Sequence, residues 1–237
     1  MPMNRLDKLL SDSGRFTRSE ARAVIRAGRV TVGGAVVRSP ELKFDAASEA
    51  ITVDGQRLDC AEARYLMLYK PAGILSATED PRQKTVLDLL PPEMQKLRLF
   101  PVGRLDKDTT GLLLLTNDGD FAHRVISPRK HVPKRYRAEV DGPLTPADAA
   151  AFADGIGLAD GTKCLPAHLE IIGETIGRVT VYEGKYHQVK RMFAARGRTV
   201  TALHRESIGS LELDGALSPG NFRPLHPEEI EAVFEDR

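Results

Sequence analysis

An arginine and two aspartates fall within five residues of one another in the segment PVGRLDKDTTGLLLLTNDGD, at positions 101–120. Arg104, Asp106 and Asp108 precede a glycine and a run of leucines, a pattern typical of a turn that leads into a buried strand. Beside a tight turn, an acidic side chain often only stabilises the turn. Two neighbouring carboxylates could also hydrolyse a glycosidic bond. On a strand, however, positions i and i+2 point to opposite faces, so we expect Asp106 and Asp108 to be poorly placed to share one substrate.

The chain around this segment has the composition of a folded protein. Its 237 residues are 41% hydrophobic and 28% charged, a balance that supports a packed core in one or two domains. The longest apolar runs are far too short to cross a bilayer, and the N-terminus lacks the pattern of a secretory signal. Two cysteines and six histidines show no spacing typical of a metal site. We therefore expect a cytoplasmic protein without a metal or a membrane partner.

The charged residues are distributed unevenly, although the formal net charge is only +1. Residues 1–38 hold eight basic and three acidic side chains, and residues 206–237 hold two basic and eight acidic ones. Residues 124–137 hold six basic and no acidic side chains. Separated clusters of opposite charge are typical of a protein that binds a polyanion along one side. Charged faces that meet only solvent would give the same pattern, so charge alone leaves both interpretations open.

The first 37 residues carry the signals of two short helices followed by a β-hairpin. Thr17 and Glu20 match a capping box that starts the second helix, and Gly28 is placed to end it. Three arginines on this helix, Arg18, Arg22 and Arg26, recur every four residues and share one face, where their like charges repel. The phosphates of an RNA backbone would offset this repulsion, whereas the alternative is a stripe that only improves solubility.

The stretch RLDKLLSDSGRFTRSEARAVIRAGRVTVGG, which contains these helices, resembles an S4 domain, a small RNA-binding module. The resemblance implies an S4 domain over residues 1–59 and a linker at residues 60–64. It also implies that the helices dock on structured RNA, which proteins read mainly by shape and phosphates. The expected RNA contacts are Arg5, Arg15, Arg18, Arg22 and Arg26.

Residues 65–237 show more strand signals than helix signals, with turn residues in many connections. We expect strands at residues 65–69, 111–116, 136–140, 167–172, 178–182 and 200–203, and helices at residues 146–153, 187–195 and 227–234. This pattern predicts an α+β domain with a mixed, mostly antiparallel sheet.

Three segments of this domain resemble the motifs of pseudouridine synthases, in the order in which that family has them. They are YKPAGILSATEDPRQKTVLDLL, then GRLDKDTTGLLLLTNDG, then EGKYHQVKRMFAARG followed by LHRESIGSLEL. The N-terminal S4 domain is similar to that of one branch of the family. Three details resemble the enzymes that modify small-subunit ribosomal RNA: HQVKRMFAA, LHRE-x-IG, and DTTGL with a following SPR. Sister enzymes that modify large-subunit RNA share much of this sequence.

The resemblance implies an isomerisation of uridine that needs no cofactor and no metal. The family places the catalytic carboxylate at Asp106, which could attack the base, attack the ribose or remove a ribose proton. A basic residue of the third motif, Lys190, would keep this carboxylate ionised, because burial alone favours its neutral form. Arg191 points elsewhere on the helix and is expected to face RNA.

Two more roles follow from the same resemblance. Tyr136 lies in the family's K-x-Y pattern with Lys134, and its ring could stack on the flipped uracil while its hydroxyl relays a proton. Lys134 belongs to a basic flank that we expect to contact RNA. Arg104 is expected to enter the gap that the extruded base leaves in the RNA helix.

The implied partner is ribosomal RNA, either 16S RNA or a small-subunit assembly intermediate, bound by a monomeric protein. Three alternatives stay open at this point. The same reaction could act on large-subunit RNA. The chain could be a non-catalytic S4-type protein that binds RNA or assists ribosome assembly. It could also be a ribonucleoside glycosidase that releases free uracil.

Overall fold

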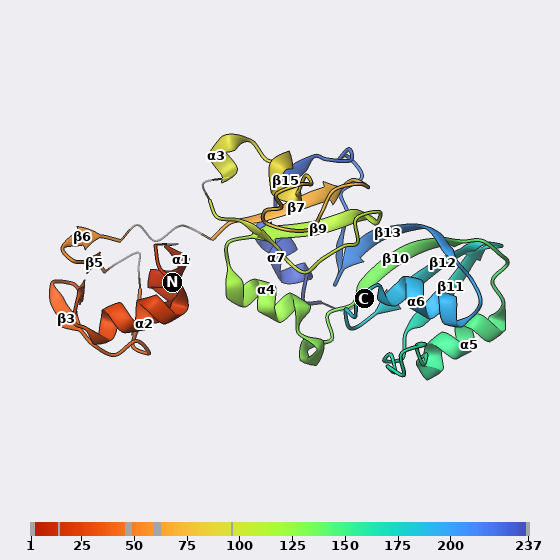
Figure 1. The fold of residues 1–237 in the computed structure, drawn as a ribbon, viewed down its shortest axis with the longest axis horizontal. Coiled ribbons are helices and arrows are strands. Elements are labelled where there is room, and N and C mark those ends of the chain that lie inside the picture. Colours follow the sequence, from red (N-terminus) through yellow and green to blue (C-terminus); the bar gives the residue numbers. More distant parts are fainter. Residues whose placement is uncertain (1–2, 14, 46–48, 59–62, 96, 236–237) are drawn as a thin grey trace. The chain divides into compact units, whose positions relative to one another are not determined.

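The computed structural model describes residues 3–13, 15–45, 49–58, 63–95 and 97–235 (Figure 1). The chain divides into two compact units, Met1–Ala63 and Arg64–Arg237. The sequence predicts a boundary at nearly the same place, and most of the predicted linker at residues 60–64 lies outside the described residues.

The N-terminal unit packs two helices on a small antiparallel sheet. Its helices are α1 (Leu6–Asp12) and α2 (Arg18–Arg26). Its four-stranded sheet has the order β3 (Ala35–Val37), β2 (Val30–Val32), β5 (Ile51–Val53) and β6 (Gln56–Arg57), and β1 (Asn4–Arg5) pairs with β4 (Lys43–Phe44).

Local signals in the sequence set the ends of the second helix. The hydroxyl of Thr17 accepts the backbone N–H of Glu20, and the Glu20 carboxylate accepts the backbone N–H of Thr17, so the predicted capping box is present. Gly28 follows the helix with φ +73°, a conformation that glycine adopts without strain. The apolar sides of α1, α2, β2 and β5 form one core around the fully buried Leu6 and Ile25.

The C-terminal unit is built on a mixed nine-stranded sheet. Its main path has the order β11 (His168–Gly173), β12 (Ile176–Val181), β10 (Lys134–Val140), β13 (Val200–Ile208), β9 (Thr110–Thr116), β7 (Tyr65–Lys70) and β15 (Phe222–Pro224). β14 (Leu211–Glu212) pairs with β13, and β8 (Phe100–Pro101) pairs with β9. The helices are η1 (Val86–Leu89), α3 (Pro92–Gln95), α4 (Gly119–Ile126), η2 (Pro128–Lys130), α5 (Pro146–Asp154), α6 (Gln188–Ala195) and α7 (Pro227–Ala232).

This sheet consists of two antiparallel halves joined by one short parallel pairing between β9 and β13. The pairing places His204 opposite Thr110 and Arg205 opposite Gly111. Gly111 has φ +107°, and a Cβ there would lie 2.7 Å from the backbone nitrogen of Arg205 and closer still to its carbonyl oxygen. The joint therefore requires glycine at this position, both for its backbone conformation and for the close approach of the two strands.

Each half of the sheet has its own core. In one half, α5 and α6 pack on β10, β12 and β13 around Phe152 and Phe193. In the other half, α4 and the region of α7 cover one face of β7 and β9, while η1 and its neighbouring loops cover the other face (Figure 1). Leu112 to Leu115 on β9 alternate between these two cores, which explains why this strand is apolar at every position.

The α+β class and the mostly antiparallel sheet are confirmed. Each of the six strands and three helices expected in the C-terminal unit is present, with ends that differ by a few residues. Helix α4 was not predicted, because its first turn reads as a loop in TNDGD. In the structure Asp118 caps this helix by accepting the backbone N–H groups of Asp120 and Phe121.

Candidate active site

The loop between β8 and β9, residues 102–109, carries the charged motif and is held by side chains from the end of β7 and from the segment that follows it. The hydroxyl of Ser76 donates to the carbonyl of Leu105 at 2.9 Å and accepts its N–H at 3.1 Å. The ammonium of Lys70, which is fully buried, donates to the carbonyls of Pro71, Lys107 and Thr109. These bonds clamp the loop on both sides of position 106, so its carboxylate projects from a fixed backbone.

The Asp106 carboxylate contacts two basic groups from the start of α6. The Nζ atom of Lys190 lies 3.2 Å from Oδ2, and Nε2 of His187 lies 3.4 Å from Oδ1. Only 22% of the Asp106 side chain is exposed. Asp106 thus lies beside the lysine that the sequence analysis proposed as its partner.

Asp108 contacts the same lysine, although the alternation of a strand would turn the two side chains to opposite faces. Its Oδ1 atom lies 2.5 Å from Nζ of Lys190, which therefore bridges Asp106 and Asp108. The alternation rule does not apply because this segment is a loop rather than a strand. The Lys190 hydrogen bond lowers the pKa of Asp108; burial lowers the pKa of Lys190, but its bonds to both carboxylates outweigh burial and raise it.

Tyr136 of β10 lines the same pocket as Asp106. The pocket also includes Arg104, Glu183, His187 and Leu203, so it draws on the catalytic loop, the segment before α6 and strands β10 and β13. The phenol oxygen of Tyr136 accepts a long hydrogen bond, 3.4 Å, from the guanidinium of Arg205. The sequence analysis missed Arg205, which is 4% exposed and also donates to the carbonyl of Leu112 across the β9–β13 joint.

Comparisons with known proteins agree with this geometry. The family model described as RNA pseudouridylate synthase matches residues 64–195, and the S4 domain model matches residues 4–51. The chain belongs to the RNA pseudouridylate synthase family. The enzyme is thus a pseudouridine synthase with an N-terminal S4 domain.

Relatives of this synthase match over nearly its whole length. The "Ribosomal small subunit pseudouridine synthase A" of Yersinia pestis is 46% identical over 97% of both chains, and the protein of that name from Escherichia coli (strain K12) is 45% identical over 97% of this chain and 99% of its own. An RNA pseudouridine synthase of Bacillus subtilis (strain 168), described as uncharacterized, is 46% identical over 98% of both chains. A crystal structure titled as a pseudouridylate synthase superposes with a TM-score of 0.72 at 38% identity, covering 97% of this chain and 99% of that one.

The other predicted residues of the synthase domain fall in three different settings. Arg104 is exposed at the pocket, where a role toward RNA stays a prediction. Arg191 points away from Lys190, as the helical geometry predicted, and pairs with Asp160 at 2.5 Å. The expectation that Lys134 contacts RNA is wrong: it is 7% exposed, and its ammonium donates to the carbonyls of Val125 and Val132.

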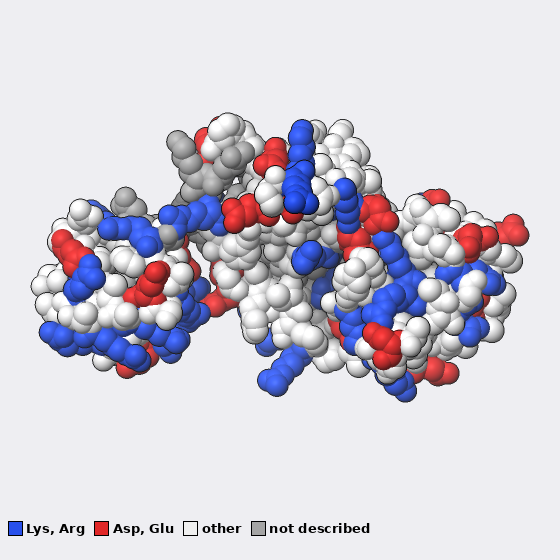
Figure 2. Space-filling model, viewed as in Figure 1, with Lys and Arg blue, Asp and Glu red and all other residues white. Residues whose placement is uncertain are grey.

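In the S4 unit, basic side chains gather over α2 (Figure 2). Part of their mutual repulsion is offset within the protein by Asp7, which the sequence analysis did not consider. This buried carboxylate accepts from Arg5 and Arg22 and lies 3.8 Å from Arg18. Burial alone would raise the pKa of Asp7, but the arginines outweigh burial and lower it to about 2.

Arg15 and Arg26 complete the predicted set in this unit. Arg15 donates to the side chain of Gln56, and both arginines are exposed. The side chains of all five arginines keep a substantial solvent-exposed surface, so the unit retains a basic face despite Asp7.

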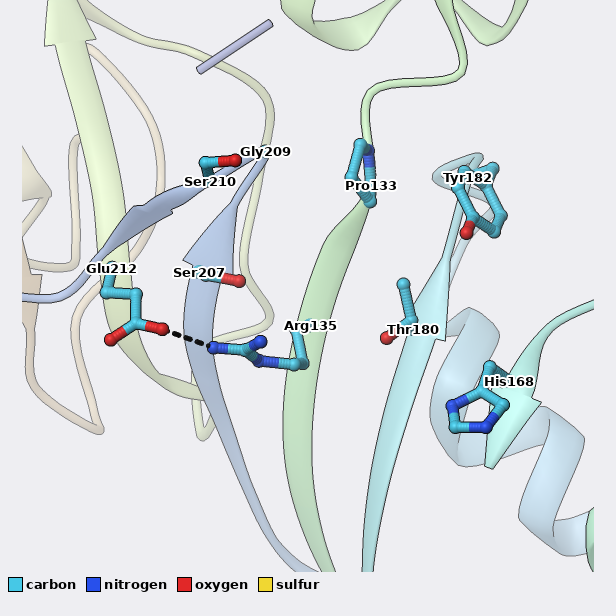
Figure 3. A pocket seen from close by; sticks show the side chains of 9 residues that line it. All are labelled: Pro133, Arg135, His168, Thr180, Tyr182, Ser207, Gly209, Ser210 and Glu212. Atoms are coloured by element: carbon cyan, nitrogen blue, oxygen red, sulfur yellow. Dashed lines mark hydrogen bonds and ion pairs between the residues drawn. The ribbon is translucent and has the colours of Figure 1, made fainter. Parts of the chain in front are cut away.

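A second cavity lies on the opposite face of the sheet from Tyr136 (Figure 3). It is lined by Arg135 of β10 and Thr180 of β12, which are cross-strand partners on the face away from the Asp106 pocket. Its charged groups pair with each other, since Arg135 donates to Glu212 at 2.8 Å. None of its lining residues is a carboxylate paired with a lysine, as Asp106 is with Lys190.

Two further features concern the described residues as a whole. None of their helices is long and apolar enough to cross a membrane. No three of their histidine, cysteine, aspartate or glutamate side chains are grouped so that they could hold a metal ion.

The functional residues that the sequence analysis missed all lie inside its quoted motifs. Lys70 ends an otherwise apolar strand, Arg205 interrupts another, and Ser76 follows the first motif's turn. A charged residue at a buried strand position is a signal that could have singled out Lys70 and Arg205, because burial of an unpaired charge is costly. His187 and Ser76 carry no such signal.

Proposed function

We propose that this synthase converts a uridine of small-subunit 16S ribosomal RNA to pseudouridine, with Asp106 as the catalytic carboxylate. The observation that carries the proposal is that Asp106 and Tyr136 line one pocket while Lys190 lies 3.2 Å from the Asp106 carboxylate, although the three residues are far apart in the sequence. The relatives named as small-subunit enzymes support the choice of RNA. An enzyme that modifies ribosomal RNA is expected to act in the cytoplasm, and we propose that location here.

The proposed reaction rearranges bonds within one nucleotide. The bond between C1′ of ribose and N1 of uracil breaks, the base turns, and C1′ bonds to C5, which then loses its proton while N1 gains one. Each of the three possible uses of Asp106 requires an ionised carboxylate, for which Lys190 at 3.2 Å supplies a counter-ion. We assign the hydroxyl of Tyr136 the acceptance or relay of the C5 proton, and its ring the stacking on the base.

Access to the uridine requires that the base leave its helix, which costs a few kcal/mol of stacking and pairing. Arg104 stands exposed beside Asp106 at the pocket, and its guanidinium has no ion-pair partner among the described residues. We assign it the space left in the RNA by the extruded base. The basic face of the S4 unit, with Arg15, Arg18 and Arg26, binds phosphates of the same RNA, either free or within an assembling subunit, and the enzyme acts as a monomer.

The test is turnover by Asp106→Asn, with Asp108→Asn as the matched control. The two residues contact the same lysine, but 75% of the Asp108 side chain is exposed and only Asp106 lines the pocket. Asp106→Asn should reduce pseudouridine formation at least about 10³-fold while RNA affinity stays within about tenfold. Asp108→Asn should keep most of the activity. A carbodiimide-based assay on transcribed RNA measures both, and substantial turnover by Asp106→Asn would refute the assignment.

Mapping pseudouridine in both ribosomal RNAs of a strain that lacks the gene identifies the target. Loss of one modification in 16S RNA supports the proposal, whereas loss in large-subunit RNA assigns the enzyme to the sister reaction. Chromatography of the reaction mixture provides a second check, because release of free uracil would indicate glycoside hydrolysis instead of isomerisation. RNA binding without either product would indicate a non-catalytic role.

A further inference from the structure

Tyr186 is an exposed aromatic residue at the edge of the catalytic pocket. Its side chain is 77% exposed, the highest value among the large apolar side chains that the structure describes. One face of its ring stacks on the imidazole of His187, with ring centroids 3.9 Å apart and planes inclined by 18°. The other face is open to solvent. An aromatic ring with one covered and one open face is suited to stack on a further planar group.

The imidazole beneath Tyr186 belongs to the active site itself. His187 lines the pocket, and its Nε2 atom lies 3.4 Å from Oδ1 of Asp106. Its backbone has φ +48°, in the left-handed region that non-glycine residues seldom adopt. Such strain persists only where the surroundings hold it in place, and it is concentrated at functional sites.

A buried polar network holds the turn that presents Tyr186 and His187. Glu183, which is 6% exposed, accepts from the amide of Gln188 and from the backbone N–H of Leu165. Gln188, which is 5% exposed, in turn accepts the backbone N–H of Lys185 at 2.9 Å. The turn is thus closed on itself by side-chain bonds, so Tyr186 is held out toward solvent by a preorganised support.

The surroundings of Tyr186 favour RNA over a protein partner. Its carbonyl accepts from the guanidinium of Arg191 at 3.3 Å, and Lys185 is its neighbour in the chain. Both cations pair with carboxylates, Arg191 with Asp160 and Lys185 with Glu183. The exposed ring itself is therefore the feature that matches a nucleobase, because bases that leave the helix are bound by aromatic stacking. A protein partner would instead need a contiguous apolar patch.

We propose that the open face of Tyr186 stacks on an unpaired base next to the target uridine, so that the Tyr186–His187 pair positions the substrate strand beside Asp106. This inference rests on the proposed function and adds which part of the RNA the enzyme grips. Tyr186 is a binding and positioning residue here, whereas the chemical step belongs to Asp106 and its partners.

Steady-state kinetics of two variants test the stacking. Tyr186→Ala should raise KM about 5- to 100-fold, with a smaller effect on kcat, because one base–aromatic stack is lost. Tyr186→Phe should keep KM within about threefold of wild type, since stacking uses the ring rather than the hydroxyl. Ile172→Ala, which truncates an exposed apolar side chain on the edge strand β11, should match wild type and serves as the control.

A fluorescent base gives a readout that does not depend on turnover. RNA with 2-aminopurine before or after the target uridine should lose fluorescence when it binds wild type or Tyr186→Phe, but not when it binds Tyr186→Ala. The inference is overturned if Tyr186→Ala keeps the wild-type KM and quenching, or if Tyr186→Phe behaves like Tyr186→Ala. Absence of pseudouridine formation by the wild-type enzyme would instead overturn the proposed function, so the two failures are distinguishable.

Discussion

Substitution of Gly111 by alanine tests whether the joint between β9 and β13 sets the geometry of the active site. The two strands share only two cross-strand pairs, and one of them places Gly111 opposite Arg205. A Cβ at position 111 would lie 2.7 Å from the backbone nitrogen of Arg205, and backbone atoms cannot move aside as a flexible side chain can. The strands must therefore separate or the local backbone must change.

The expected loss of stability has two parts. Holding an alanine at φ +107° costs about 1–3 kcal/mol, and the steric overlap adds about 1–3 kcal/mol if it resembles an overpacked core. The sum of about 2–6 kcal/mol corresponds to a fall in Tm of about 4–24 °C for a unit of this size. The loss of activity should exceed what unfolding explains, because a displacement of about 1 Å at the site can cost about 10²-fold in rate.

Thermal melting and pseudouridine formation at a temperature well below both Tm values measure these effects separately. Gly157→Ala is the matched control, since a Cβ there meets no atom within 4 Å and its backbone is not in the left-handed region. It should melt and react like wild type. If Gly111→Ala also melted within about 1 °C of wild type and kept full activity, the joint would not position the site as argued here.

Two titrating groups give further predictions. Burial lowers the pKa of Lys70 to about 8, although the negative charges of Asp108 and Asp106 act to raise it. The neutral amine has one donor fewer than the ammonium for the three carbonyl groups that it binds. Turnover should therefore fall as pH rises through about 8. The unfolded chain holds this proton up to a pH near 10.5, so the contribution of Lys70 to the free energy of unfolding rises between about pH 8 and pH 10.5. A kcat–pH profile that stays flat over this range while the melting temperature falls would contradict this reasoning. In the S4 unit the pKa of Asp7 is lowered from 3.8 to about 2, so its contribution of up to about 2 kcal/mol is complete above pH 3.8 and is lost as pH falls toward 2. Asp7→Asn should remove it at neutral pH, which hydrogen exchange of α1 and α2 in the full chain would detect as reduced protection, and unchanged protection would argue against the arginine–carboxylate cluster.

The elements that could be predicted are those whose signals are local. The capping box of α2 needs only Thr17 and Glu20, and the apolar run of β9 identifies a strand buried on both faces. Helix α4 escaped because its cap, Asp118, lies in a segment that reads equally well as a turn. The order of strands in the sheet depends on contacts between distant residues, which no local pattern encodes.

The site shows the same division. The resemblance to a known family led to Asp106, Lys190 and Tyr136; in the structure Asp106 and Tyr136 line one pocket, and Lys190 contacts the Asp106 carboxylate. The sequence did not reveal that Asp108 also contacts Lys190, because the loop was interpreted with the alternation rule of a strand. Lys134 was assigned to RNA because its neighbours in the sequence are basic, whereas its own position on β10 faces inward, where two carbonyl groups satisfy it.

The three motifs are separated in the sequence because each supplies a different support for one carboxylate. The first motif clamps the backbone on both sides of Asp106 through Lys70 and Ser76. The third motif neutralises the carboxylate through Lys190, and the strand that follows it carries Arg205 to the joint with β9 and to Tyr136. A short chain segment could provide a carboxylate, but it could not also provide a rigid backbone, a buried cation and a facing aromatic ring. The catalytic geometry is therefore a property of the joint between the two halves of the sheet, and substitutions that loosen this joint should impair the reaction even where they touch neither Asp106 nor RNA.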